Sequence, residues 1–164
     1  MTYWSKPKIP HKGWKYIKVV DLGEGVAPGE SISYEYCEMC GEKIRYVHIL
    51  THLEYDGEIH VGCDCAAKLT EDYINPEEHE RRLINKSNRR TTFLKRKWTY
   101  KSETGNYTLR YKRECITIMR SRYDSGWGVI FRGEQQWKYK GMKIRDFDTA
   151  VLAAFELFDE LYDL

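Results

Sequence analysis

The chain has 164 residues, of which 41% are hydrophobic and 32% charged, and its formal net charge is +2. This composition is typical of a water-soluble protein, and the length allows one domain of ordinary size or two small ones. No apolar run approaches the roughly 20 residues that a membrane helix requires, and Met1-Thr2-Tyr3-Trp4 lacks the apolar core of a signal peptide. We therefore expect a cytoplasmic protein with no membrane partner.

Residues 1 to 13 contain proline and lysine and are expected to form a flexible N-terminus. The following run from Trp14 to Leu22 is rich in β-branched and aromatic residues and predicts a first strand. Glycines and a proline then indicate a loop over residues 23–30, and Ser31 to Tyr36 predicts a short strand before the first cysteine.

Four of the five cysteines fall between residues 37 and 69. Cys37 and Cys40 flank two residues and precede Gly41, a spacing that allows a tight turn to point both sulfurs inward, as in a zinc knuckle. Cys63 and Cys65 form a second pair at the start of a predicted helix over residues 66–73. Clustering of this kind favours a metal site in a reducing compartment over disulfides.

The residues between the two cysteine pairs predict a β-hairpin, with β-rich runs over residues 44–50 and 58–61 around Tyr55-Asp56-Gly57. A knuckle, a hairpin and a helix that supplies the remaining ligands make up a treble-clef-like arrangement. We expect such a zinc-binding module over residues 14–75.

Zinc is the expected cofactor because about thirty residues cannot bury enough apolar surface to fold alone. A zinc ion bound by four thiolates can contribute roughly 10–16 kcal/mol to folding. The predicted ligands are Cys37, Cys40, Cys63 and Cys65. If one cysteine points away, His60 is the substitute that we prefer, with His48 as a further choice. The alternative is a pair of buried reduced thiols with a redox-active Cys-x-x-Cys motif.

This module resembles a known set of sequences. It contains the run Cys-x-x-Cys-Gly-x-x-Ile-Arg-Tyr-Val-His, which is preceded by His-Lys-Gly-Trp and followed by Val-Gly-Cys-x-Cys-Ala-x-x-Leu. This pattern is similar to that of small uncharacterised proteins of bacteria and their phages. The resemblance covers about residues 11 to 98 and also extends to treble-clef modules in which Val-Gly-x-x-Cys opens the helix. It implies metal binding and a bacterial or phage source, and it implies no activity.

A long helix is predicted after the cysteine module. Asn75, Pro76 and the acids that follow are typical of a helix start, and no further glycine or proline occurs before Gly105. We expect a basic helix over residues 76–98. Its cations are the predicted contacts to nucleic-acid phosphates: Arg81, Arg82, Lys86, Arg89, Arg90, Lys95, Arg96 and Lys97.

Charge supports that expectation, because residues 81 to 113 carry twelve bases and one acid. Residues 21 to 80, by contrast, carry fifteen acids and three bases. A basic run of this density predicts a surface that follows phosphates, and exposed Trp or Tyr side chains could stack on bases. The alternative is a solvated helix that pairs with acids of the same chain.

Residues 99–164 alternate apolar and polar side chains and predict an antiparallel sheet of three or four strands. An amphipathic helix that begins at Asp148 or Thr149 would cover this sheet. The order weakly resembles the sheet-plus-helix DNA-binding domains of phage integrases, and with the basic helix it resembles a double-stranded RNA-binding domain. The expected fold class is therefore α+β.

Three functional hypotheses follow. The first is a zinc-stabilised, non-catalytic accessory protein that binds DNA or RNA. The second is a phage-type module that docks on or inhibits a host protein, with its acidic segment mimicking nucleic acid. The third is a metal-dependent nuclease, since His48 and His52 lie between the cysteine pairs. Against the nuclease, residues 66–70 offer no further metal ligand in the predicted helix.

Overall fold

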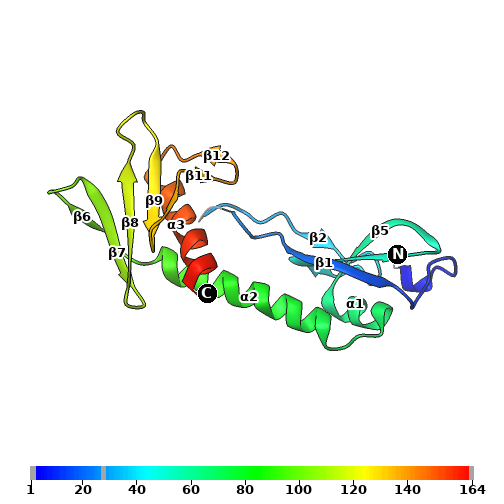
Figure 1. The fold of residues 1–164 in the computed structure, drawn as a ribbon. Coiled ribbons are helices and arrows are strands. Elements are labelled where there is room, and N and C mark those ends of the chain that lie inside the picture. The colour runs from blue at the N-terminus through cyan, green and yellow to red at the C-terminus, as the bar shows by residue number, and fades with distance from the viewer. Residues whose placement is uncertain (1–2, 27–28, 163–164) are drawn as a thin grey trace. The chain divides into compact units, whose positions relative to one another are not determined.

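The computed structural model describes residues 3–26 and 29–162. The chain divides into two compact units, Met1–Ser87 (unit 1) and Asn88–Leu164 (unit 2). The division falls within helix α2 (Asn75–Leu94), so the last residues of that helix belong to unit 2. The described part contains three α-helices and several antiparallel sheets, which confirms the predicted α+β class (Figure 1).

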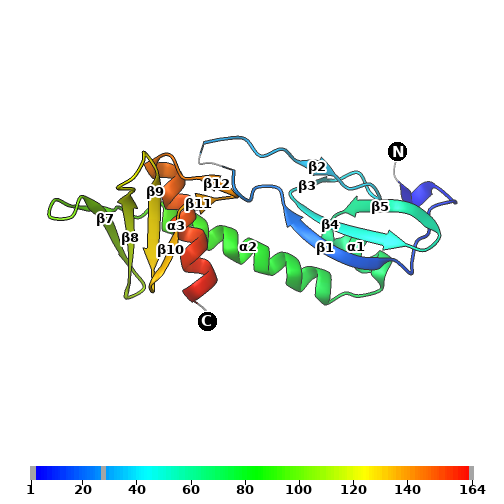
Figure 2. The same cartoon turned by 45° about the horizontal axis from the view of Figure 1, so that its top comes forward.

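Unit 1 is built on a three-stranded antiparallel sheet in the order β1-β4-β5, with helix α1 beside it (Figure 2). Its elements are the 3-10 helix η1 (Tyr3–Ser5), β1 (Lys15–Asp21), β2 (Glu35–Tyr36), β3 (Lys43–Ile44), β4 (Tyr46–His52), β5 (Tyr55–Val61) and α1 (Cys63–Thr70). Strands β4 and β5 form the predicted hairpin, in which Leu50 pairs with Ile59. The two-residue strands β2 and β3 pair with each other on either side of the first cysteine turn.

The core of unit 1 lies around the cysteines. Met39, Leu50, Ile59 and Leu69 are fully buried and belong to one apolar cluster with Cys37 and Cys65. In β5 the burial alternates, because Ile59 and Val61 face this core while His60 lies on the other side of the strand. The sulfurs are therefore part of the core and not of an exposed loop.

Unit 2 is a five-stranded antiparallel sheet in the order β10-β9-β8-β7-β6. Its elements are β6 (Thr99–Lys101), β7 (Asn106–Tyr111), β8 (Glu114–Arg120), β9 (Trp127–Phe131), β10 (Glu134–Gln136), β11 (Lys138–Tyr139), β12 (Met142–Lys143) and α3 (Phe147–Tyr162). The sheet has more strands than the predicted three or four because the three-residue strands β6 and β10 are too short for alternation to reveal them. Strands β11 and β12 form a separate hairpin.

Helix α3 packs against β8 and β9 and covers one face of this sheet (Figure 1). The side chains that face it are buried and aliphatic or aromatic: Leu109, Tyr111, Ile116, Ile118, Val129 and Phe131. Successive strand residues point to opposite faces, so Arg110, Thr117 and Met119 belong to the face turned away from α3. That second face has no helix of unit 2 upon it among the described elements.

Helix α2 differs from the predicted helix at both ends. It begins at Asn75, and the Asp72 carboxylate accepts the backbone N–H groups of Ile74 and Asn75, each at 3.0 Å. It ends at Leu94 and not near residue 98, because the chain turns there and the Arg96 N–H donates to the Phe93 carbonyl at 3.1 Å. None of the helices in the described ranges combines the length and apolarity needed to cross a bilayer.

Phe93 anchors α2 in the core of unit 2. Its ring is fully buried and lies 5.4 to 5.9 Å from the ring centroids of Tyr111, Phe155 and Phe158. We expect Phe93→Ala to lower the free energy of unfolding of unit 2 by about 3–5 kcal/mol, because the truncation leaves a cavity among rings that cannot close over it. Denaturant unfolding measures this change. The neighbouring exposed variant Thr92→Ala should stay within about 0.5 kcal/mol of the parent, and an equal effect of both variants would contradict the assignment.

Candidate metal centre

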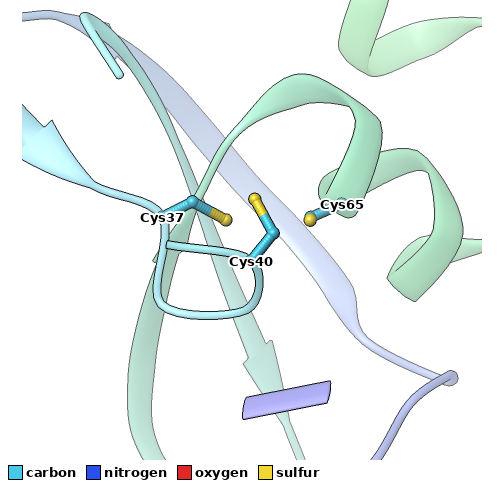
Figure 3. A group of neighbouring side chains, drawn as sticks. All are labelled: Cys37, Cys40 and Cys65. Atoms are coloured by element: carbon cyan, nitrogen blue, oxygen red, sulfur yellow. The ribbon is translucent and has the colours of Figure 1, made fainter. Parts of the chain in front are cut away.

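Three thiols converge in unit 1. The sulfurs of Cys37, Cys40 and Cys65 lie within 4.8 Å of one another, a spacing at which one metal ion could be held by all three. Cys37 and Cys40 come from the turn between β2 and β3, and Cys65 comes from the first turn of α1 (Figure 3). The predicted pairing of the Cys-x-x-Cys turn with the helix start thus brings three of the four predicted ligands together.

Backbone hydrogen bonds shape the turn. The Cys37 N–H donates to the Glu42 carbonyl at 2.7 Å, and the Gly41 N–H donates to the Cys37 carbonyl at 2.8 Å. Gly41 has a φ of 81°, a left-handed conformation that glycine adopts without a steric penalty. The turn therefore requires a residue that tolerates a positive φ at position 41, which explains why a glycine directly after the second cysteine predicts the knuckle.

The three sulfurs share protons unequally. Acceptance of a hydrogen bond from Cys65 lowers the pKa of Cys37 to about 4, against the opposing effect of burial, and the backbone N–H groups of Gly62, Cys40 and Met39 lower it further. The same contact with Cys37 raises the pKa of Cys65, and burial raises that of Cys40. A divalent cation that prefers thiolate ligands could replace the protons that these sulfurs share.

Trp4 adds a further polar contact to the cluster. Its indole N–H points at the Cys65 sulfur, with Nε1 and Sγ 3.4 Å apart. The backbone of the same segment is tied to the turn, since the N–H groups of Tyr3 and Trp4 donate to the carbonyls of Glu38 and Met39. Tyr3 and Trp4, expected to belong to a flexible N-terminus, are thus in contact with the cysteine turn.

Cys63, the fourth predicted ligand, does not belong to this group among the described residues. Helix α1 already begins at Cys63, so Cys63 and Cys65 are separated by about 200° around the helix axis. Since Cys65 points at the turn, Cys63 points elsewhere, and its sulfur lies within 4.8 Å of ligand atoms of His48 and Glu80. The predicted helix began only at residue 66, which left both thiols before it, whereas Gly62 is the residue before the helix in the structure.

The group around Cys63 is organised by a buried histidine. The His48 side chain is fully buried on β4, with Nε2 3.1 Å from Glu80 Oε1 and Nδ1 3.0 Å from the Tyr16 hydroxyl. Burial, together with the negative charge of Glu80, raises the pKa of Cys63 to about 11. Burial also raises the pKa of Tyr16, so its hydroxyl keeps its proton.

The other histidines of this region have different partners. His60 Nδ1 lies 2.9 Å from Glu35 Oε1, and the His60 side chain is not part of the thiol group. His52 Nε2 lies 3.1 Å from the Lys12 carbonyl oxygen, and its Nδ1 accepts the Glu54 N–H. His48 and His52, the pair that suggested a nuclease, therefore do not share a metal-ligating group among the described residues.

Acids of unit 1 pair with the first three predicted phosphate contacts on α2. Arg81 lies 2.9 Å from Glu77 and 3.4 Å from Glu78, and Arg82 lies 3.8 Å from Glu78. Lys86 lies 3.4 Å from Glu24. A count of charges by segment misses such pairs, because Glu77 and Glu78 lie just outside the basic run and Glu24 lies 62 positions before Lys86.

The next two cations of α2 pair within unit 2. Arg89 contacts both carboxylate oxygens of Asp159 at 2.7 and 3.0 Å, and the buried Arg90 contacts Glu156 at 3.1 Å. These bonds fasten the end of α2 to α3. Lys95, Arg96 and Lys97 follow the helix and are exposed. The Arg96 guanidinium lies 5.2 Å from the centre of the Tyr111 ring, within range of a cation–π contact.

Sequence reasoning did not single out a hollow on unit 2. It has a volume of about 770 Å³ and lies beside the Ser121 to Gly126 turn. Among its lining residues are four cations, two aromatic rings and one acid: Arg120, Arg122, Lys138, Lys143, Tyr123, Trp137 and Asp124. The available signal was the run Gln-Trp-Lys-Tyr-Lys after Gly133, in which a tryptophan stands next to lysine.

The fold and these sites define an α+β protein of two units, one of which carries a thiol cluster that could hold a metal ion. Comparison of the chain with protein-family models, curated proteins and solved structures gave no match. The geometry of the chain itself is therefore the basis for the function proposed below.

Proposed function

We propose that this chain is a non-catalytic, zinc-stabilised nucleic-acid-binding protein of bacterial or phage type. Zinc would be held by Cys37, Cys40 and Cys65, and nucleic acid would bind at the hollow of unit 2. The observation that carries the proposal is the combination of cations and exposed rings in that hollow. Thiolates are ligands that zinc prefers and that Mg²⁺ and Ca²⁺ avoid, which supports zinc as the metal.

Trp137 supplies a flat apolar surface in the hollow. Its ring lies over Gly128, where an added Cβ would come within 2.7 Å of the ring, and its N–H donates to Gln135 Oε1 at 3.2 Å. The side chain is nevertheless 38% exposed, and Tyr123, which also lines the hollow, is 97% exposed. Exposed aromatic rings of this kind are suited to stacking with bases.

Cations surround these rings. Arg120, Arg122 and Lys138 form no ion pair with another described residue, whereas Lys143 lies 2.9 Å from Asp124. Phosphates of a nucleic-acid strand whose base stacks on Trp137 would lie near these side chains, because all of them line the same hollow. Phosphate contacts of this kind supply most of the affinity of such proteins. This location differs from the predicted one on the basic segment, where five of the eight cations, all of them on α2, have acidic partners.

The test is binding of the purified zinc-loaded chain to labelled single- and double-stranded DNA and RNA over a salt series. We expect binding that weakens steeply as salt rises. Trp137→Ala should weaken it roughly 5- to 160-fold, which corresponds to the 1–3 kcal/mol of one stacked base. The matched control is Tyr73→Ala, which removes an exposed ring of unit 1.

Two results would overturn this proposal. Absence of binding to every probe at ~50 mM salt would exclude phosphate contacts of useful strength. A protein partner, the second hypothesis from the sequence, would then be the better candidate. Equal affinity of the parent and Trp137→Ala would exclude the hollow as the binding site.

A further inference from the structure

We infer that His48, Cys63 and Glu80 form a second divalent-metal site, distinct from the three-thiol cluster. One ligand atom from each residue lies within 4.8 Å of the other two. The three residues come from β4, from the start of α1 and from α2, and all belong to unit 1. Residues so far apart in sequence meet here only because the fold brings the three elements together.

The chemistry of the ligands fits a divalent cation of the zinc class. Imidazole nitrogen, thiolate sulfur and carboxylate oxygen are its three usual protein donors. One thiolate and one carboxylate would balance the charge of a divalent ion, which matters because the His48 side chain is fully buried and Glu80 is only 23% exposed.

Tyr16 fixes the histidine for this role. A proton on Nδ1 can be donated to the Tyr16 hydroxyl oxygen, 3.0 Å away, which leaves the lone pair of Nε2 directed toward Glu80. A hydrogen bond to the second ring nitrogen is a regular feature of metal-binding histidines, because it sets the tautomer and the orientation of the ring.

A metal site explains the geometry better than a cysteine nucleophile does. A catalytic pair needs one ring nitrogen facing the sulfur and the other facing the orienting acid. Here Nε2 faces the acid, while Nδ1 is occupied by a tyrosine hydroxyl. The Cys63 sulfur, a Glu80 carboxylate oxygen and a His48 ring nitrogen lie within 4.8 Å of one another, as ligands of one ion would.

Three protein ligands leave one position for solvent. Cys63 and Glu80 both line an open cavity of about 330 Å³, which Cys40 and Cys65 of the thiol cluster also line. A zinc ion with three protein ligands and an accessible fourth position can exchange the ligand at that position. We expect the ion at His48, Cys63 and Glu80 to be bound more weakly than the ion at the thiol cluster, because it has one thiolate ligand in place of three.

Metal content tests the inference. The full chain is loaded with Zn²⁺, freed of excess metal by gel filtration and analysed by atomic emission. We expect two ions per chain for the parent and one for Glu80→Gln and for Cys63→Ser. The control Glu77→Gln removes a neighbouring acid outside the group and should keep two ions. One ion in the parent, or two in Glu80→Gln, would overturn the second site.

The same experiment separates this site from the four-cysteine site predicted from sequence. If Cys63 completed a single tetrahedral centre, Cys63→Ser would weaken the only ion and Glu80→Gln would leave it unchanged. Titration of the unmodified parent with Co²⁺ gives an independent readout that needs no folded variant. Thiolate-to-cobalt absorption should grow in two steps, the first from three thiolates and the second from one. Saturation at a single equivalent would contradict the inference.

Discussion

Cys40→Ser is expected to unfold unit 1 while unit 2 keeps its structure. A structural zinc site contributes roughly 10–16 kcal/mol to folding, which equals or exceeds the usual total stability of a small domain. The sulfurs lie in the core of unit 1 beside Met39 and Leu69. Loss of the ion would therefore leave polar thiol groups inside the apolar cluster with no ion to hold them together. Unit 2 has a core of its own, centred on Phe93 and α3.

Amide hydrogen exchange followed by mass spectrometry resolves the two units. Protection should disappear from β4 and β5 and persist in β8 and β9. Removal of metal from the parent with a chelator should give the same pattern. The matched control is Cys115→Ser, because Cys115 is exposed on unit 2. Full protection of β4 and β5 in Cys40→Ser would show that the thiol cluster is not a structural metal site.

The elements predicted most accurately are those whose signal is local. The run of β-branched and aromatic residues from Trp14 to Leu22 located β1 to within a residue, and alternation predicted an antiparallel sheet under a helix in residues 99–164. Cys37, Cys40 and Gly41 identified a turn whose two sulfurs lie close together. The conformation of these segments is determined mainly by residues that are adjacent in sequence, and contacts with distant parts of the chain do not change it. The predicted hairpin over residues 44–61 has the same origin.

The assignment of Cys63 shows where local reasoning ends. Cys63 and Cys65 are two positions apart. Their side chains point to the same side and could share an ion if the chain is extended, but they point in nearly opposite directions if it is helical. A shift of the helix start from Ala66 to Cys63 decides between the two. The residues that surround Cys63 instead, His48 and Glu80, lie 15 and 17 positions away, and no periodicity relates them.

The basic segment shows a second limit, which is electrostatic. Its net charge is a property of the sequence, but the availability of each cation depends on the fold. Arg90 is buried and donates to Glu156, a residue 66 positions away. Arg89 donates from Nε and Nη2 to the two carboxylate oxygens of Asp159. A cation in such a pair stabilises the contact between α2 and α3 and would have to leave its partner to reach a phosphate.

Replacing Arg120, Arg122 and Lys138 together by Gln is expected to weaken nucleic-acid binding by about a hundredfold or more at low salt. Removing one cation that touches a phosphate should also lower the slope of log K against log salt by about 0.7–0.9. A drop of roughly two to three in that slope would mean that all three side chains bind phosphates directly. The measurement is a salt series of binding to the same labelled nucleic acids, made on the zinc-loaded chain.

The control variant carries the same change of charge at the cations predicted from sequence in unit 1, namely Arg81, Arg82 and Lys86, each replaced by Gln. Because these cations already pair with acids and would release few counterions from a phosphate backbone, we expect a much smaller reduction of affinity and an almost unchanged slope. The reverse outcome, with the unit 1 variant weakened and the unit 2 variant unaffected, would move the phosphate-binding surface to α2. Equal and small reductions of affinity in both variants would mean that only the net charge of the chain matters, and that neither surface positions the nucleic acid.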